Sequence, residues 1–283
     1  MPNSHPLGTA IVTGASSGIG KVYAERLAAR GYDLVLVARR GDRLREIAAD
    51  LGARFGVRAE PLVADLAQPA GVAAVSDRIA DETVSLVVNN AGFSALKALT
   101  ETPDDVVASM IALNVTALTL LSKAALAAFQ ARGSGTLVNI GSGAGFAPYP
   151  KIPVYGATKA YVYHFTQSLQ SEVAGTNVRV QLVLPGAVVS EGWEVAGGGA
   201  LEALPASVVM TTEECVDAAL AGLDKGEPVT APSLQDETLL RNHETDTQAL
   251  LQAMFDARPA ARYGLRPQSQ AGGAEAGIDV QTL

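Results

Sequence analysis

Cysteine is nearly absent from this sequence, because Cys215 is the only one in 283 residues. A single thiol excludes an intramolecular disulfide and any metal centre built on cysteines. Histidine is also scarce, with three in the chain, and neither His5 nor His243 has neighbours at metal-ligand spacing. We therefore expect no metal site.

Positive charge and long apolar runs are also in short supply. Lysine and arginine number 21 against 29 aspartates and glutamates, which gives a net charge of −8 and disfavours a nucleic-acid-binding protein. The most apolar region, 106–129, is interrupted by polar residues such as Asn114 and Lys123, which indicates a buried helix rather than a membrane span. Residues 1–9 contain no basic segment followed by an apolar stretch, so we expect no signal peptide and a cytoplasmic location.

What the sequence does contain is an alternation of short apolar runs with longer helical patterns. Hydrophobic residues make up 48% of the chain and charged residues 18%, as in a globular α/β protein. The short runs are apolar on both faces, which is typical of strands buried between two helical layers. This pattern predicts an α/β fold with a doubly wound parallel sheet of about seven strands, the Rossmann fold. The expected strands are 9–13, 33–38, 57–64, 85–88, 136–140, 179–184 and 228–231, and the expected helices are 18–30, 42–54, 69–80, 103–132 and 154–174.

We expect residues 1–283 to form one catalytic domain, because no repeat or linker divides the chain. The core is predicted at 8–231. Residues 191–210 interrupt the alternation with three consecutive glycines and are interpreted as a lid. Residues 232–283 form a C-terminal extension with an amphipathic helix near 235–255 and an end that we expect to be mobile.

A glycine-rich turn with the sequence TGASSGIG follows the first predicted strand and opens a helix. Its glycines permit a tight turn and let backbone N–H groups approach a pyrophosphate at the positive end of the helix. Three glycines alone are a weak signal, and a purely structural turn is the alternative, but in the first strand–turn–helix unit they indicate dinucleotide binding. The spacing resembles that of the short-chain dehydrogenase/reductase family. The turn residues expected at the cofactor are Gly14, Ser16, Ser17, Gly18, Ile19 and Gly20.

The end of the second predicted strand indicates which dinucleotide is bound. An NAD enzyme presents Asp or Glu there to the ribose, whereas this chain has Arg39 and Arg40. Arginine holds a 2′-phosphate bidentately, so NADP(H) is favoured, with two solvated surface charges as the alternative. The family resemblance implies further cofactor contacts, although a serine stands at the last of them where the family has threonine. These positions are Asp65, Leu66, Asn90, Ala91, Gly92, Pro185, Gly186, Val188 and Ser190.

Tyr155 and Lys159 are four residues apart in a predicted helix and therefore share one face. A phenol has a pKa of about 10, and a neighbouring ammonium is expected to lower it, which gives a group that exchanges protons. By the resemblance, Tyr155 is the general acid or base, and both it and Lys159 contact the cofactor, with Lys159 on the nicotinamide ribose. The resemblance also implies that Ser142 polarises a substrate carbonyl. Asn114 matches the family position that orders a water leading to Lys159, with helix packing as the alternative.

The residues that follow these motifs are expected to line the substrate pocket. Phe93 and Ser94 follow the NNAG motif, Phe146 and Tyr149 follow the catalytic serine, and Trp193 lies in the expected lid. This lining suggests a mainly apolar small molecule as the substrate. Neither nucleic acid nor membrane is an expected partner, and the resemblance implies a homodimer or homotetramer.

Together these features predict an NADP(H)-dependent oxidoreductase that interconverts a ketone or aldehyde with the corresponding alcohol by hydride transfer. The resemblance covers residues 9–231. The alternative is a nucleotide-binding sensor or scaffold that kept the fold and lost catalysis, since the fold alone does not separate the two. The presence of Ser142, Tyr155 and Lys159 together favours the enzyme. Polyketide, steroid, sugar, fatty-acyl and xenobiotic carbonyl compounds are all candidate substrates.

Overall fold

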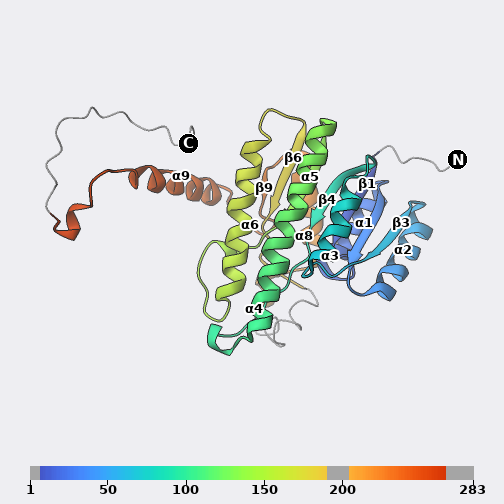
Figure 1. The fold of residues 1–283 in the computed structure, drawn as a ribbon, viewed down its shortest axis with the longest axis horizontal. Helices are drawn as coiled ribbons and strands as arrows, with labels where there is room; N and C mark the ends of the chain where they lie inside the picture. Colours follow the sequence, from blue (N-terminus) through green and yellow to red (C-terminus); the bar gives the residue numbers. More distant parts are fainter. Residues whose placement is uncertain (1–6, 190–203, 266–283) are drawn as a thin grey trace. The chain divides into compact units, whose positions relative to one another are not determined.

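The computed structural model describes residues 7–189 and 204–265 of the chain. Seven strands form a parallel sheet in the order β3-β2-β1-β4-β5-β6-β9, which confirms the predicted doubly wound α/β fold (Figure 1). The strands are β1 Thr9–Thr13, β2 Asp33–Ala38, β3 Ala59–Val63, β4 Val84–Asn89, β5 Gly135–Ile140, β6 Val178–Val183 and β9 Val229–Thr230.

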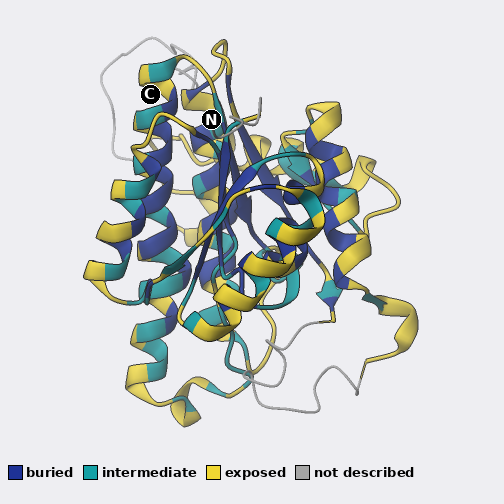
Figure 2. Cartoon of the chain, turned by 90° about the vertical axis from the view of Figure 1, so that its right-hand side faces the viewer, coloured by how far each residue is buried: buried dark blue, intermediate teal, exposed yellow. Residues whose placement is uncertain are grey.

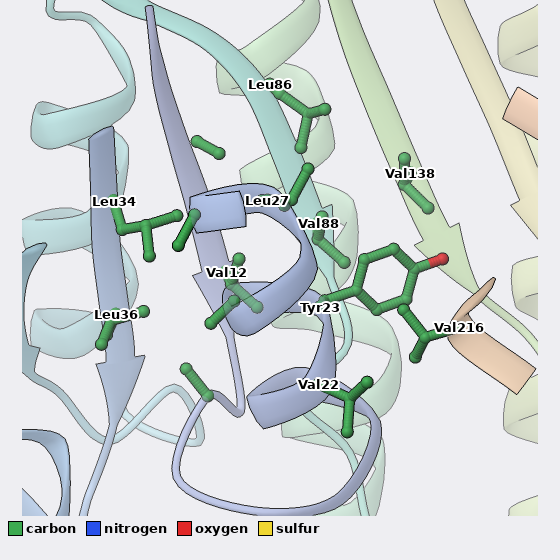
Figure 3. Close-up of a cluster of buried hydrophobic side chains, with 14 of the residues drawn as sticks. Val12, Val22, Tyr23, Leu27, Leu34, Leu36, Leu86, Val88, Val138 and Val216 are labelled. Carbon is green, nitrogen blue, oxygen red and sulfur yellow. The ribbon is translucent and has the colours of Figure 1, made fainter. Parts of the chain in front are cut away.

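Helices cover both faces of the sheet, so its inner strands are buried on both sides, whereas the edge strand β3 is only partly buried (Figure 2). On one face, the ring of Tyr23 in α1 lies beside Val216 of α8, in a cluster that also contains Leu36 of β2 (Figure 3). Leu36 points to this face, while its neighbour Val37 joins the cluster on the other face, as expected for a run apolar on both sides. The helices on the first face are α1 Gly18–Ala29, α2 Gly41–Phe55 and α8 Thr212–Lys225; those on the second are α3 Pro69–Ile79, α5 Leu118–Arg132 and α6 Pro153–Glu172.

The chain reverses its direction of winding between β1 and β4. From β1 it proceeds outward to β2 and β3, then returns to β4 on the other side of β1 and continues outward to β9. In doubly wound sheets the crevice beyond the carboxyl ends of the strands at such a point is where ligands bind. The turn after β1 and the loops after β4 and β5 therefore define the place where a site is expected.

The long helix predicted at 103–132 differs from the structure. Its middle is a π-helical segment, η2 Ala112–Ala117, between α4 Asp104–Ile111 and α5. Periodicity does not reveal this change, because one wider turn leaves the apolar pattern nearly intact. Single π turns occur mostly at functional sites, and this one contains Asn114.

The run Asp104–Arg132 is also long and apolar enough, by length and composition, to cross a membrane, with a mean hydropathy of 1.6 in its most apolar stretch. Leu121, Ala125 and Phe129 lie in the core beneath the sheet, so α5 is one of the covering helices. On the outer side, Ile111 and Leu120 are each 44% exposed. This outer apolar surface contributes to the high hydropathy.

The chain divides into two compact units, Met1–Ser233 and Leu234–Leu283. All seven strands of the large sheet belong to the first unit, whose end lies close to the predicted end of the core at residue 231. The second unit contains the predicted amphipathic helix as α9 Thr238–Ala253, followed by the short turn η5 Ala261–Tyr263. None of the residues of α9 is buried.

Candidate active site

The turn between β1 and α1 requires glycine at several positions. Gly14 and Gly18 adopt φ values of 69° and 52°, in the left-handed region that other residues rarely enter. A Cβ atom on Gly20 would lie 2.4 Å from the carbonyl oxygen of Gly14. Ser17 precedes α1, yet its hydroxyl does not cap the helix, so the N-terminal N–H groups are left to another acceptor. This cradle, which a Cβ would fill, fits a pyrophosphate group.

Thr13 and Asn90 join the turn to the loop after β4. The hydroxyl of Thr13 accepts hydrogen bonds from the backbone N–H groups of Asn90 and Ala91, at 2.9 and 3.0 Å. The Asn90 side chain donates back to the Thr13 carbonyl at 2.9 Å. Three hydrogen bonds therefore hold the two loops at the switch point together. The sequence motif places Asn90, Ala91 and Gly92 near the cofactor, but it gives no role to Thr13.

Arg40 lies directly over the glycine-rich turn. Its guanidinium donates hydrogen bonds to the hydroxyls of Ser16 and Ser17, at 3.0 and 2.8 Å from Nη2. The exposed Arg39 precedes it at the end of β2. A phosphate in this region would meet a cation and two hydroxyl groups, and no carboxylate stands between Ala38 and Gly41 to repel it. These residues fit the 2′-phosphate of NADP(H).

The loop after β3 brings Asp65 and Leu66 to the same edge of the sheet. The Asp65 carboxylate accepts a hydrogen bond from the backbone N–H of Ala67 at 3.0 Å, and its carbonyl is approached closely by Gly71. Leu66 is buried in the core cluster. Asp65 thus holds the turn in shape, and the adenine contact suggested by the resemblance stays a prediction for both residues.

Ser142, Tyr155 and Lys159 come together at the carboxyl end of β5. Ser142 begins the short helix η3 Gly143–Gly145, where its hydroxyl accepts the N–H of Ala144 at 3.2 Å and leaves its own proton free to donate. Tyr155 lies in the first turn of α6, which begins at a proline. One turn later, the buried Lys159 ammonium donates to the carbonyl of Ile140 at 2.8 Å.

Burial controls the protonation of this group. It raises the pKa of Tyr155 above its usual value, while a hydrogen bond from the Ser142 hydroxyl acts in the opposite direction. Burial also lowers the pKa of Lys159 to about 8. The expectation from the sequence was a lowered pKa for Tyr155, and it is wrong, because burial raises this pKa. The ammonium lies 5.8 Å from the centre of the Tyr155 ring and is directed at Ile140, so desolvation dominates.

Asn114 lies between α6 and the loop after β4. Its Oδ1 accepts the N–H of Phe93 at 3.1 Å, and its Nδ2 donates to the Phe93 carbonyl at 2.9 Å and to the Thr158 hydroxyl at 3.1 Å. These partners use both protons of the amide, so the side chain acts as a bridge between two elements. Water ordering toward Lys159 stays a prediction.

The loop after β6 contacts the segment that follows Ser142. Pro185 is buried, and its carbonyl accepts the N–H of Gly143 at 2.9 Å, which fixes it beside the start of η3. Gly186 is exposed, and Val188 is buried in the short strand β7 Ala187–Val188, which pairs in parallel with β8 Val209–Met210. Ser190 lies outside the described residues.

The structure describes most of the residues that are expected to line the substrate pocket. Asn114 fixes the backbone of Phe93, and Phe93 and Ser94 are both half-exposed. Phe146 is 40% exposed and packs edge-on against Tyr163, with ring centres 5.0 Å apart. Tyr149 is more exposed, in the loop before α6. Trp193 and most of the expected lid lie outside the described residues; the end of the lid forms β8 and the short helix η4 Ala206–Val208.

A glycine turn at the switch point of a doubly wound sheet, next to a Ser–Tyr–Lys group, defines the class of dinucleotide-binding α/β proteins. Comparison with known proteins makes this specific. The sequence pattern of the family described as short chain dehydrogenase matches residues 8–196. The chain belongs to the short-chain dehydrogenase/reductase family.

Curated relatives of the chain include both active and inactive proteins. The chain is 33% identical over 180 residues to "Very-long-chain 3-oxoacyl-CoA reductase-A" of Danio rerio, covering 62% of this chain and 56% of that protein. It is 39% identical over 197 residues to "Sulfoacetaldehyde reductase 2" of Chromohalobacter salexigens, covering 67% and 76%. It is also 32% identical to "Inactive hydroxysteroid dehydrogenase-like protein 1" of Homo sapiens, of which 54% is covered. The chain thus spans little more than half the length of two of these three relatives.

Two solved structures match more of the chain. One is a short-chain dehydrogenase from Sphingobium yanoikuyae in complex with NADPH, with a TM-score of 0.87 and 43% identity over 91% of this chain and all of that one. The other is a bulky-bulky ketone specific alcohol dehydrogenase from Comamonas testosteroni, with a TM-score of 0.83 and 38% identity over 91% of this chain and 98% of that one.

Proposed function

We propose that this protein is an NADP(H)-dependent oxidoreductase that interconverts a ketone or aldehyde with the corresponding alcohol. The observation that carries the proposal is the hydrogen-bonded pair of Ser142 and Tyr155, beside the buried ammonium of Lys159. Two hydroxyl groups that can meet one substrate oxygen, at the edge of the sheet where a dinucleotide fits, are the groups that carbonyl reduction needs.

The residues that would hold the dinucleotide follow from the cradle. The turn from Gly14 to Gly20 and the N-terminus of α1 would bind the pyrophosphate. Arg40, with Arg39, would bind the 2′-phosphate, which selects NADP(H) over NAD(H). Lys159 and Tyr155 would contact the nicotinamide ribose. When bound, the nicotinamide supplies or accepts the hydride.

The protein's own part in the reaction is proton transfer and charge stabilisation. In the reducing direction, the Tyr155 hydroxyl donates its proton to the carbonyl oxygen as negative charge develops there. Ser142 donates a hydrogen bond to the same oxygen and stabilises that charge. The raised pKa of Tyr155 keeps the phenol protonated at neutral pH and therefore ready to act as the acid. Oxidation of the alcohol is the same path in reverse.

We propose a ketone with two large substituents as the substrate. The Comamonas testosteroni structure, which matches 91% of this chain, is that of a bulky-bulky ketone specific alcohol dehydrogenase. The exposed rings of Phe146 and Tyr149, near the catalytic serine, offer apolar surface for such substituents. The Chromohalobacter salexigens relative is named as an aldehyde reductase. A small polar aldehyde is therefore the substrate against which bulky ketones are compared.

The existence of an inactive relative keeps a silent NADP(H)-binding protein as the second candidate. Ser142, Tyr155 and Lys159 are all present in this chain, which supports the enzyme. Turnover separates the two candidates, because a silent protein would bind NADPH without oxidising it.

The test measures the loss of NADPH absorbance with a panel of diaryl ketones, dialkyl ketones and small aldehydes. We expect turnover with bulky ketones, and a fall in kcat of at least about 100-fold in Tyr155→Phe, because the proton donor is lost. The Kd for NADPH should rise far less than kcat falls, because Tyr155 would supply only one of several contacts to the cofactor. Tight NADPH binding without turnover across the panel would instead support the silent binding protein.

Cofactor preference is tested in the same experiment with Arg40→Ala. We expect its Kd for NADPH to rise about 10-fold or more, since a charge-assisted phosphate contact is lost, while its Kd for NADH stays nearly constant. Arg54→Ala is the matched control, because Arg54 lies in the last turn of α2, the helix that Arg40 precedes, and pairs with Glu25 and Asp50. Equal effects of both variants on NADPH binding would contradict the role of Arg40.

A further inference from the structure

Thr158 is a buried hydroxyl for which the sequence motifs provide no role. It is 3% exposed and lies between the catalytic tyrosine and the lysine in α6. Its Oγ1 donates a hydrogen bond to the backbone carbonyl of Tyr155 at 2.8 Å. The same oxygen accepts a hydrogen bond from Nδ2 of Asn114 at 3.1 Å. Thr158 therefore joins Tyr155 to a residue 44 positions away in the sequence.

The direction of each bond in this chain is fixed by its donors. The N–H of Phe93 can only donate, so it sets Oδ1 of Asn114 toward itself. The two protons of Nδ2 then go to the Phe93 carbonyl and to Thr158. Thr158 has one proton, and it goes to Tyr155. Every proton has one acceptor, so the linkage has a single arrangement.

The linkage connects two parts of the proposed active site. Phe93 follows the loop that Thr13 ties to the glycine-rich turn through Asn90 and Ala91. Gly92 lets this loop approach, because a Cβ there would lie 3.0 Å from Oδ1 of Asn114. At the other end, Tyr155 carries the reacting hydroxyl. Thr158 therefore connects this loop, through Asn114, to the first turn of α6.

We propose that Thr158 is a positioning residue for the reaction, whose hydroxyl holds the backbone of Tyr155 in register with Asn114 and the loop after β4. This inference rests on the proposed function. Its consequence is that loss of the hydroxyl lowers the rate of the chemical step and leaves cofactor binding in place, because a small misplacement of a reacting group is costly to the rate.

Thr166 provides a matched control in the same helix. It is fully buried, its hydroxyl donates to the carbonyl of Val162 at 2.7 Å, and it accepts a hydrogen bond from Nδ2 of Asn139 at 3.1 Å. The bonding pattern is the same as at Thr158, but neither Val162 nor Asn139 belongs to the reacting group. Thr166→Val therefore removes an equivalent structural bond two turns further along α6.

The experiment compares Thr158→Val, Thr158→Ala, Thr158→Ser and Thr166→Val with the wild type. It measures kcat, the KM for ketone and NADPH, the pH dependence of kcat, and the thermal midpoint. We expect kcat to fall about 10-fold in Thr158→Val and Thr158→Ala, with the KM for NADPH within about twofold of wild type and a displaced pH profile. Thr158→Ser should recover most of the rate, because the hydroxyl returns.

Thr166→Val should lower the thermal midpoint yet leave kcat and the pH profile as in wild type. The inference on Thr158 is overturned if Thr158→Val and Thr158→Ala behave as Thr166→Val does, or if Thr158→Ser fails to recover the rate. Lack of turnover in the wild type is a different result, which refutes the proposed function and this inference with it.

Discussion

At the residue scale, the protonation of Tyr155 is a balance between burial and one hydrogen bond. Burial is the larger effect and raises the pKa, because a phenolate loses its hydration in the protein interior. The Ser142 hydroxyl stabilises the phenolate and acts against burial. The nearby Lys159 is itself desolvated, and the pKa of its ammonium falls to about 8. The neutral phenol is thus the resting form, which suits a proton donor.

This balance predicts opposite pH dependences for the two directions of the reaction. Reduction needs the phenol, which is present below the raised pKa of Tyr155, so the rate should not fall through neutral pH because of this group. Oxidation needs the phenolate, so its rate should rise with pH. Steady-state rates of ketone reduction and alcohol oxidation, measured across the same buffers, check both statements.

Ser142→Ala tests the cause of this pH dependence. Without the Ser142 hydrogen bond the pKa of Tyr155 rises further, so the oxidation profile should move to higher pH while its maximal rate falls. A profile that stays in place, or one that moves to lower pH, would show that Ser142 does not stabilise the phenolate.

At the element scale, the β1–turn–α1 unit depends on the absence of side chains. Gly20 lies so close to the preceding turn that a Cβ would also fall 2.5 Å from Nδ2 of Asn90. Asn90 is the residue that ties this turn to β4. The glycines thus shape the cradle and also allow the two loops at the switch point to touch.

We expect Gly20→Ala to reduce the affinity for NADPH by about 10-fold or more and to lower the thermal midpoint, because the turn must move away from the new methyl group. Isothermal titration with NADPH and thermal unfolding measure the two effects. Gly52→Ala, within α2, is the control. A Cβ at Gly52 would meet only the Val57 carbonyl, at 3.4 Å. That variant should be about 0.5–1 kcal/mol more stable. Normal NADPH binding by Gly20→Ala would contradict the proposed cradle.

The π turn in the helical run 104–132 is the second element that shapes the candidate site. Its wider turn contains Asn114, whose amide meets both Phe93 and Thr158. A regular helix was the natural prediction from the apolar spacing. The departure from it occurs where a buried polar side chain has to reach partners in two other elements.

At the scale of the whole molecule, an apolar surface lies on the outer side of the α4–α5 run and α6. Ile111, Leu120 and Tyr161 are between 38% and 44% exposed, and the Tyr161 hydroxyl bonds to Thr119 at 2.8 Å across the two elements. Exposed apolar patches of this kind often mark protein–protein contacts. We propose that a second copy of the chain packs here, in a homodimer or homotetramer.

Leu120→Glu should then reduce the molar mass in solution from an oligomer to a monomer, because a buried unpaired carboxylate disfavours the interface. Size-exclusion chromatography with light scattering measures this change. Leu7→Glu is the control, since Leu7 is similarly exposed at 43% but lies before β1. A monomeric wild type, or an oligomer that survives Leu120→Glu, would refute the proposed interface.

Much of the architecture could be predicted from the residues alone. Both β1 and β2 have the bounds that the sequence predicts, because the apolar residues 10–12 and 34–38 form the part of each strand that is buried between the helices. α1 begins at Gly18, within the glycine-rich turn, as expected. The positions of Tyr155 and Lys159 on one helix face also follow from their spacing alone, since the helical period is fixed.

Other features of the candidate site depend on contacts between residues distant in sequence, so they are visible only in the folded structure. The bridge from Phe93 through Asn114 to Thr158 joins three elements, so no local pattern reveals it. The direction of the Tyr155 pKa shift likewise depends on how deeply the fold buries the phenol, which the spacing between Tyr155 and Lys159 does not reveal. Local sterics and burial act along the chain, so the residues alone predict the strands, the glycine-rich turn and the candidate reacting residues. The folded structure determined their hydrogen-bond partners and their protonation, because desolvation and hydrogen bonding act through space.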